Sequence, residues 1–90
     1  MKTGIELIAQ ERAEQIEKHG FDVENDKDYA HNELIKAALF AINPYQFEWP
    51  YYWDEEFRTK IRNKPNDIER LKVAGALIAA EIDRLNLLTP

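Results

Sequence analysis

The fold is decided by residues 67–87, which read DIERLKVAGALIAAEIDRLNL. Apolar side chains recur there in alternating steps of three and four residues, which is the period of one face of an α-helix. Asn66, followed three residues later by Glu69, resembles a capping box that satisfies the first free amides of a helix. We therefore expect a helix from Asp67 to Leu87. Its seam consists of Ile68, Leu71, Gly75, Ile78, Ile82 and Leu85, widened on one side by Ala74, Leu77 and Leu88.

A second amphipathic helix is expected near the start of the sequence. Isoleucines recur at helical spacing from residue 5 to residue 16. Thr3 can cap the first turn, and the pair His19-Gly20 supplies a stop signal. The pattern predicts a helix from Gly4 to His19.

A third helix is expected between these two, from Asp28 to Ile42. Its end, AALFAI at residues 37–42, is apolar on every side, and a helix tolerates this only when neighbours surround it. Pro44 ends the helix because proline disfavours the helical conformation of its predecessor and cannot donate a hydrogen bond. We interpret this segment as the buried central helix.

The connection between the second and third helices along the chain is rich in aromatic side chains. We expect it to fold back over the helix ends as a lid, because three short helices alone bury little core. Aromatic faces can also stack on a nucleobase, so Trp49 or Trp53 can hold a purine, and one lid can do both. The connection holds seven of the ten aromatic residues: Tyr45, Phe47, Trp49, Tyr51, Tyr52, Trp53 and Phe57.

Composition limits the class of protein. Residues 1–90 are expected to form one all-α domain, with three main helices in an orthogonal or up-down bundle and a long aromatic-rich loop. The net charge of −5 argues against a surface that follows nucleic-acid phosphates. The chain has no cysteine and no serine, which excludes thiolate and serine nucleophiles. With no secretory signal and no membrane-spanning stretch, we expect a cytoplasmic protein.

Charged side chains interrupt the apolar stripe of each expected helix. Arg12, Glu33 and Glu81 lie among aliphatic or aromatic neighbours, and an unpaired ion in a dry core costs several kcal/mol. One interpretation is a buried salt bridge from Arg12 to Glu33 or Glu81, with Gln15 completing the hydrogen bonds. The other is a divalent cation held by carboxylates of different helices. Lys72, on the opposite edge of the seam from Glu81, can reach a phosphate or extend into water.

The order of these residues resembles that of a known family. The sequence is similar to small phage and prophage proteins named dATP/dGTP diphosphohydrolase-like, which are grouped with MazG-like nucleotide pyrophosphohydrolases. The similarity extends from about Glu6 to Leu85. The residues that carry it are Glu11-Arg12, Gln15, Gly20-Phe21, Asp26, Asp28, Glu33-Leu34, Ala37-Ala38, Trp49-Pro50, Lys64-Pro65, Asp67 and the run from Lys72 to Arg84.

The resemblance implies an activity and a set of site residues. MazG-like enzymes bind Mg²⁺ through a Glu-Glu-x-x-Glu helix and a later Glu-x-x-Asp helix, whereas this sequence has Glu11-x-x-Glu14 and Glu81-x-Asp83. The reaction would be attack of water on the α-phosphorus of a nucleotide, with release of pyrophosphate. The implied metal ligands are Glu11, Glu33 and Glu81; the implied catalytic residues are Glu33, Glu81 and Lys72; and the implied substrate-binding residues are Arg12, Gln15, Trp49 and Trp53.

Two other function classes remain open at this point. One is a small non-catalytic phage accessory protein that binds another protein, its internal charges serving only to fix packing. The other is a nucleotide-binding module without turnover. A bundle of three helices with an apolar central one also favours association of two chains, so a homodimer is expected.

Overall fold

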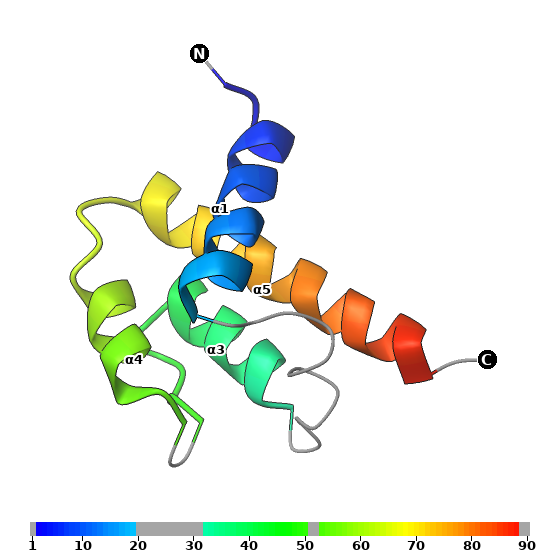
Figure 1. Ribbon diagram of the computed structural model, residues 1–90. Coiled ribbons are helices and arrows are strands. Elements are labelled where there is room, and N and C mark those ends of the chain that lie inside the picture. Colours follow the sequence, from blue (N-terminus) through cyan, green and yellow to red (C-terminus); the bar gives the residue numbers. More distant parts are fainter. Residues whose placement is uncertain (1, 20–31, 51–52, 89–90) are drawn as a thin grey trace.

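The computed structural model describes residues 2–19, 32–50 and 53–88, and this part of the chain holds four α-helices and no strand (Figure 1). The predicted all-α fold is confirmed, with one helix more than expected. The predicted start of the second helix, residues 28–31, lies outside the described residues. None of the described helices is long and apolar enough to cross a membrane. The helices are α1 (Gly4–His19), α3 (Glu33–Ile42), α4 (Glu55–Arg62) and α5 (Asp67–Leu88).

The predicted caps of α1 and α5 are present. Thr3 Oγ1 accepts a hydrogen bond from the Glu6 amide at 3.2 Å, and the Thr3 amide donates to the Glu6 carboxylate at 3.0 Å. These bonds from Thr3 lower the pKa of Glu6 below its ordinary value. At the start of α5, Asn66 Oδ1 accepts from the Glu69 amide at 3.0 Å. Side chains therefore satisfy free amides at both helix starts, as their sequences predicted.

The additional helix α4 lies inside the segment that we expected to be a loop. Asp54 is its N-cap residue, and the Asp54 side chain accepts a hydrogen bond from the Phe57 amide at 3.0 Å. Acidic residues occupy the first turn and basic residues the last, which is the arrangement that the helix dipole favours. Phe57 and Ile61, four residues apart, form its buried face. The aromatic connection thus contributes core through a helix as well as through a loop.

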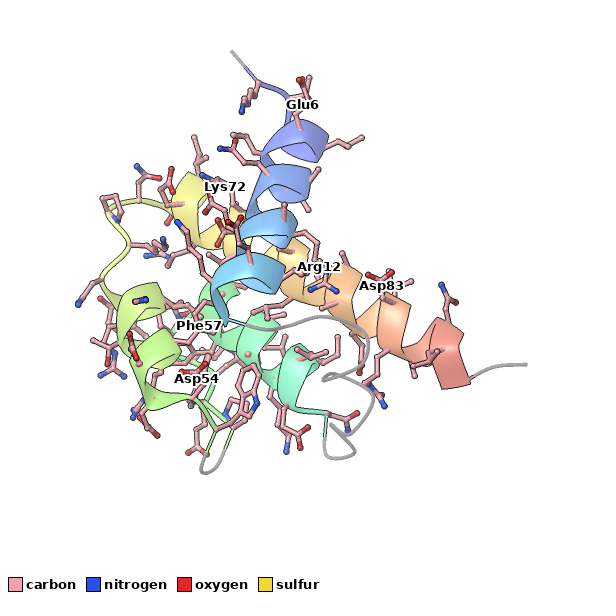
Figure 2. The ribbon with its side chains drawn as sticks, viewed as in Figure 1. Glu6, Arg12, Asp54, Phe57, Lys72 and Asp83 are labelled. Atoms are coloured by element: carbon pink, nitrogen blue, oxygen red, sulfur yellow. The ribbon has the colours of Figure 1, made fainter. Side chains whose placement is uncertain are left out.

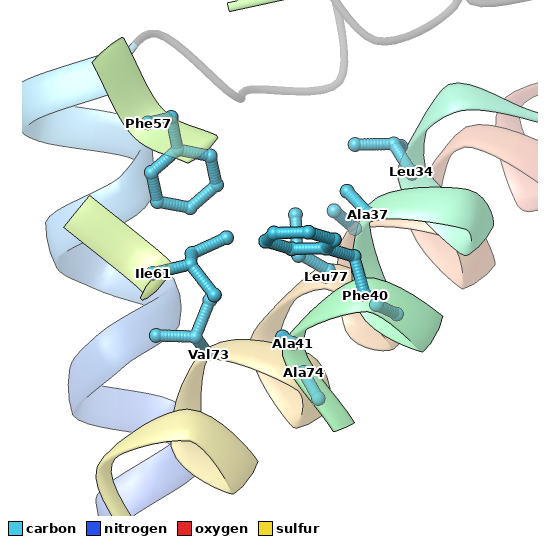
Figure 3. Packing of buried hydrophobic residues seen from close by; sticks show 11 residues of the cluster. Leu34, Ala37, Phe40, Ala41, Phe57, Ile61, Val73, Ala74 and Leu77 are labelled. Atoms are coloured by element: carbon cyan, nitrogen blue, oxygen red, sulfur yellow. The ribbon is translucent and has the colours of Figure 1, made fainter. Parts of the chain in front are cut away.

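The long helix α5 is the spine of the structure. The helix α3 packs beside it, and α1 lies across it (Figure 1). The core between α3, α4 and α5 surrounds Phe40, whose ring lies against side chains of all three helices (Figure 3). The core residues are Leu34, Ala37, Ala38, Phe40, Ala41, Phe57, Ile61, Val73, Ala74, Leu77 and Ala80, with Trp49 and Trp53 packed against them.

The face of α5 that fills this core is not the predicted seam. Val73, Leu77 and Ala80 are fully buried, whereas Leu71 and Ile82 are each 52% exposed. The buried face contains three alanines, Ala74, Ala76 and Ala80, whose small side chains let the neighbouring helices approach closely. The sequence showed apolar residues on both sides of α5; α3 and α4 cover one side, and α1 crosses the other at Gly75.

The helix α1 crosses α5 at Gly75, where the side chain of Ile8 fills the space beside the glycine. A Cβ atom added at Gly75 would lie 2.6 Å from Cδ1 and 2.7 Å from Cγ1 of Ile8. Any side chain at position 75 therefore forces the side chain of Ile8 to move.

Replacing Gly75 with valine is expected to lower the free energy of unfolding by about 1–3 kcal/mol, the usual cost of overpacking. Urea denaturation followed by circular dichroism measures the change. Adding Ile8→Ala vacates the space that the valine needs, so the double variant should recover part of the loss. A Gly75→Val protein as stable as the parent would contradict this close approach.

Candidate functional site

A polar pocket of about 160 Å³ lies between α1 and α4. We call it the α1–α4 pocket. Drug-sized ligands occupy sites of roughly 300–1,000 Å³, so this pocket has room for phosphate groups and an ion rather than for a whole nucleotide. Its lining residues are Glu11, Glu14, Gln15 and Lys18 from α1, Phe57 and Lys60 from α4, and Lys64 from the segment that follows.

Glu11 is the buried carboxylate of the pocket, with only 9% of its surface exposed. Burial raises the pKa of Glu11 above its ordinary value of 4.5. Lys64 and Lys72 oppose this rise, whereas the negative charges of Glu14 and Glu69 add to it. Glu11 therefore lies where charges of both signs from α1, α5 and the segment after α4 meet.

Gln15 is the second buried polar side chain, only 1% exposed. Its Nε2 donates a hydrogen bond to the backbone oxygen of Val73 at 3.4 Å. Its Oε1 is buried and accepts no hydrogen bond from the residues that the structure describes. A buried oxygen without a donor is costly, and such groups in native proteins often mark a bound water or ion.

Three oxygen-bearing side chains of the pocket share one face of α1. Glu11, Glu14 and Gln15 are spaced i, i+3 and i+4, so they are neighbours on the helix surface. Carboxylate and amide oxygens are the ligands that Mg²⁺ and Ca²⁺ prefer. The oxygen donors and the unsatisfied Oε1 of Gln15 fit a divalent cation.

Lysines supply the positive charge of the pocket. Lys60 Nζ lies 3.4 Å from Glu56 Oε1, and the Lys60 side chain is half exposed. Lys64 acts electrostatically on Glu11, as does Lys72, which is bound to Glu69 at 3.2 Å. Lys18 completes the lining from α1. Glu11 and Lys72, which the resemblance assigned to one site as metal ligand and catalytic residue, thus lie near enough for their charges to interact, although Lys72 does not line the α1–α4 pocket.

The other embedded charges pair elsewhere. Arg12 reaches across to α5, where its Nη2 lies 3.3 Å from Asp83 Oδ2 (Figure 2). Glu81 is bound to Arg84 on the same helix, and both side chains are at least nine-tenths buried. One of the two interpretations of the sequence paired Arg12 with Glu33 or Glu81, whereas the described contacts place it with Asp83. Arg84, one turn beyond Glu81 on the same helix, is the nearer partner of Glu81.

The metal set implied by the resemblance is not assembled in the described part of the chain. No three His, Cys, Asp or Glu side chains come close enough there to hold a metal ion. Glu33 lies in the first turn of α3, and Glu81 lies with Arg84 in the later half of α5. Glu11 faces the α1–α4 pocket instead, so these three glutamates do not form one metal site among the described residues.

The two tryptophans lie together against the core. The ring centroids of Trp49 and Trp53 are 5.3 Å apart, which is the separation of aromatic rings in direct contact. Trp49 also meets Phe40 and Phe57 edge-to-face, and its Nε1 donates a hydrogen bond to the Trp53 backbone oxygen. No space is left for a base between the two indoles. Their role as a lid over the core is observed, and stacking on a base stays a prediction.

Lys60 and Lys64, the two lysines that line the pocket opposite α1, were not predicted from the sequence. Both lie in the segment that we expected to be a loop, so their spacing of four residues did not indicate a shared helix face. The signal was present in Asp54, which is followed by two glutamates and, four residues later, by basic residues. That order is typical of a short capped helix.

Comparison with known proteins identifies no relative. No protein-family model, no curated protein and no solved structure gives a significant match to this chain. The site must therefore be interpreted from its own geometry.

Proposed function

We propose that the protein is a Mg²⁺-dependent hydrolase of nucleoside triphosphates that releases pyrophosphate. The observation that supports this proposal is the α1–α4 pocket, in which two carboxylates and an unsatisfied amide oxygen face lysines across a small polar space. Such a pocket combines ligands for a divalent cation with counter-charges for phosphate. The resemblance to phage dATP/dGTP diphosphohydrolase-like proteins adds the deoxynucleotides as candidate substrates, and we infer from the sequence that the protein acts in the cytoplasm.

Each side chain has a role in this proposal. Glu11, Glu14 and Gln15 would hold Mg²⁺, which supplies a Lewis acid for the phosphoryl oxygens. Lys60 and Lys64 bind the phosphate oxygens and neutralise the charge that develops on the leaving pyrophosphate. A carboxylate oxygen of Glu11 or Glu14 orients the attacking water by accepting its hydrogen bond. The proposal therefore assigns the ion to α1 and leaves Glu33 and Glu81 outside the site.

The direct experiment is incubation of the purified protein with each dNTP and Mg²⁺ in H₂¹⁸O. The expected products are pyrophosphate and a deoxynucleoside monophosphate that carries the ¹⁸O label, because water attacks the α-phosphorus. Absence of product with every dNTP would contradict hydrolysis. In that case, a rise in melting temperature with Mg²⁺ and dNTP together would indicate a binding module, and no rise would favour the accessory protein.

Removing the lysines of the pocket is expected to weaken substrate binding. Lys60→Gln with Lys64→Gln should raise KM for the dNTP by about 10-fold or more, since a hydrogen bond to a charged group contributes about 1.5–3 kcal/mol. Steady-state kinetics measure this change. Lys36→Gln on α3, outside the pocket, is the matched control and should leave KM unchanged. Equal KM values for the parent, the double variant and Lys36→Gln would contradict phosphate binding by Lys60 and Lys64.

A further inference from the structure

Another pocket lies beside the first two turns of α1, whereas the α1–α4 pocket lies beside its later turns. It has a volume of about 320 Å³ and lies between the first turns of α1 and α5, which diverge from the crossing of the two helices at Gly75 (Figure 1). We call it the α1–α5 pocket. Its aliphatic walls are Leu7 and Ile8 from α1 and Ile68 and Leu71 from α5.

The walls of the α1–α5 pocket select for an aliphatic ligand. Among the described residues, no side chain that lines it is aromatic or carries a hydroxyl, amide or carboxylate group. A nucleobase has several hydrogen-bonding groups that these side chains would leave without partners, whereas a hydrocarbon chain buries only apolar surface. An apolar cavity of about 150 Å³ holds the six carbons of benzene, so this pocket has room for a chain on the order of eight to ten carbons.

Two lysines also line the pocket, and the charge of only one of them is balanced by an acid. Lys72 Nζ lies 3.2 Å from the Glu69 carboxylate. Lys2 Nζ instead donates a hydrogen bond of 2.7 Å to Gln10 Oε1, which is a neutral amide oxygen. Lys2 forms no ion pair with any residue that the structure describes. One uncompensated positive charge therefore lies at the edge of an aliphatic pocket, which fits a ligand with a single negative charge.

We propose that the α1–α5 pocket binds the carboxylate form of a free medium-chain fatty acid. The acyl chain lies against the four aliphatic side chains, and the carboxylate accepts a hydrogen bond from Lys2 Nζ, which has further donors besides the one that Gln10 uses. Anionic membrane surfaces are bound by clusters of several lysines and arginines, whereas here one lysine is uncompensated. The pocket therefore suits the free acid better than a lipid bilayer.

The dependence of affinity on chain length tests this proposal without reference to nucleotide hydrolysis. Isothermal titration calorimetry at pH 7 with hexanoate and octanoate measures the two dissociation constants. Octanoate should bind about 10-fold more tightly than hexanoate, because each methylene that the pocket buries tightens binding up to about 4-fold. Equal affinity for the two acids, or no binding of octanoate, would overturn the proposal.

Substitutions at the pocket separate the chain from the carboxylate. Leu71→Glu should weaken octanoate binding by about 10-fold or more, because it removes an apolar wall and adds a repelling charge. Leu87→Glu is the matched control, since Leu87 lies at the far end of the same helix with a similar exposure, 48% against 52%, and it should bind octanoate like the parent. Lys2→Gln should weaken octanoate binding by about 3-fold, the scale of an exposed ion pair, and leave binding of 1-octanol unchanged.

Two further measurements keep the test decisive. Circular dichroism checks that Leu71→Glu is folded, and Ile68→Glu, at a wall residue that is 62% exposed, repeats the test if it is not. Octanoate binding by both glutamate variants equal to that of the parent would overturn the proposal. Sedimentation with phosphatidylglycerol vesicles distinguishes the membrane: if vesicles sediment the parent but not Leu71→Glu, and octanoate does not bind, the pocket belongs to a membrane surface and the proposal is wrong.

Discussion

Glu11→Gln is expected to reduce dNTP hydrolysis by roughly 100-fold or more, the scale on which loss of a group at the reacting centre acts. The substitution keeps the size of the side chain and its ability to accept one hydrogen bond. It removes the negative charge that the proposal uses to hold the ion. Product formation under saturating Mg²⁺ and dNTP measures the loss.

The same substitution is expected to make the folded protein more stable at pH 7 when no ion is bound. Burial raises the pKa of Glu11, so its charged form is less favourable in the folded chain than in the unfolded chain. Stability from this group is therefore fully present below its ordinary pKa of 4.5 and is lost as pH rises through the raised value. Urea unfolding in EDTA should give Glu11→Gln the higher free energy of unfolding at pH 7, and the difference should shrink below pH 4.5.

Glu17→Gln is the matched control, since Glu17 lies on the same helix and is exposed. It should change neither hydrolysis nor the pH dependence of stability. A Glu11→Gln protein that hydrolyses dNTPs as fast as the parent would contradict the proposed site. A protein that loses both activity and stability would assign Glu11 a structural role instead.

The sequence predicted the helices well because their signals are local. The starts of α1 and α5 follow from Thr3 and Asn66, whose side chains make the capping bonds that their positions suggested. The end of α3 follows from Pro44 in the same way. The helix α4 was missed because its eight residues contain only two apolar core positions, too few to show a period.

The arrangement of the faces was harder to predict, because it depends on contacts between distant segments. The sequence shows apolar residues on both sides of α5 and cannot say which side the chain itself covers. The partners of the embedded charges were hard to predict for the same reason. Arg12 pairs with Asp83, 71 residues away, and only the crossing of α1 over α5 brings them together. Glu11 was identified as a ligand, but its neighbours across the pocket come from a helix that was not expected.

The resemblance places Glu81 in the metal site, whereas its contacts indicate a structural pair, and a substitution separates the two roles. Glu81→Gln is expected to lower the free energy of unfolding by about 3 kcal/mol, because it removes the charge of a buried carboxylate that is bound to a buried arginine. Glu81 is 5% exposed and Arg84 is 8% exposed, so water compensates little of the loss. Urea denaturation at pH 7 measures the change. Asp83→Asn, which removes a half-exposed partner of Arg12, should cost less than about 1 kcal/mol.

Replacing both members of the pair tests the same point from the other side. Buried ion pairs can often be exchanged for apolar side chains of similar volume without loss, since the cost of desolvating both charges disappears. Glu81→Met with Arg84→Met should therefore be more stable than Glu81→Gln alone and should retain dNTP hydrolysis. If Glu81→Gln instead unfolds like the parent chain but no longer hydrolyses dNTPs, the structural interpretation is wrong. Glu81 would then belong to the site that the resemblance implies, and the ion would lie nearer α5 than the α1–α4 pocket.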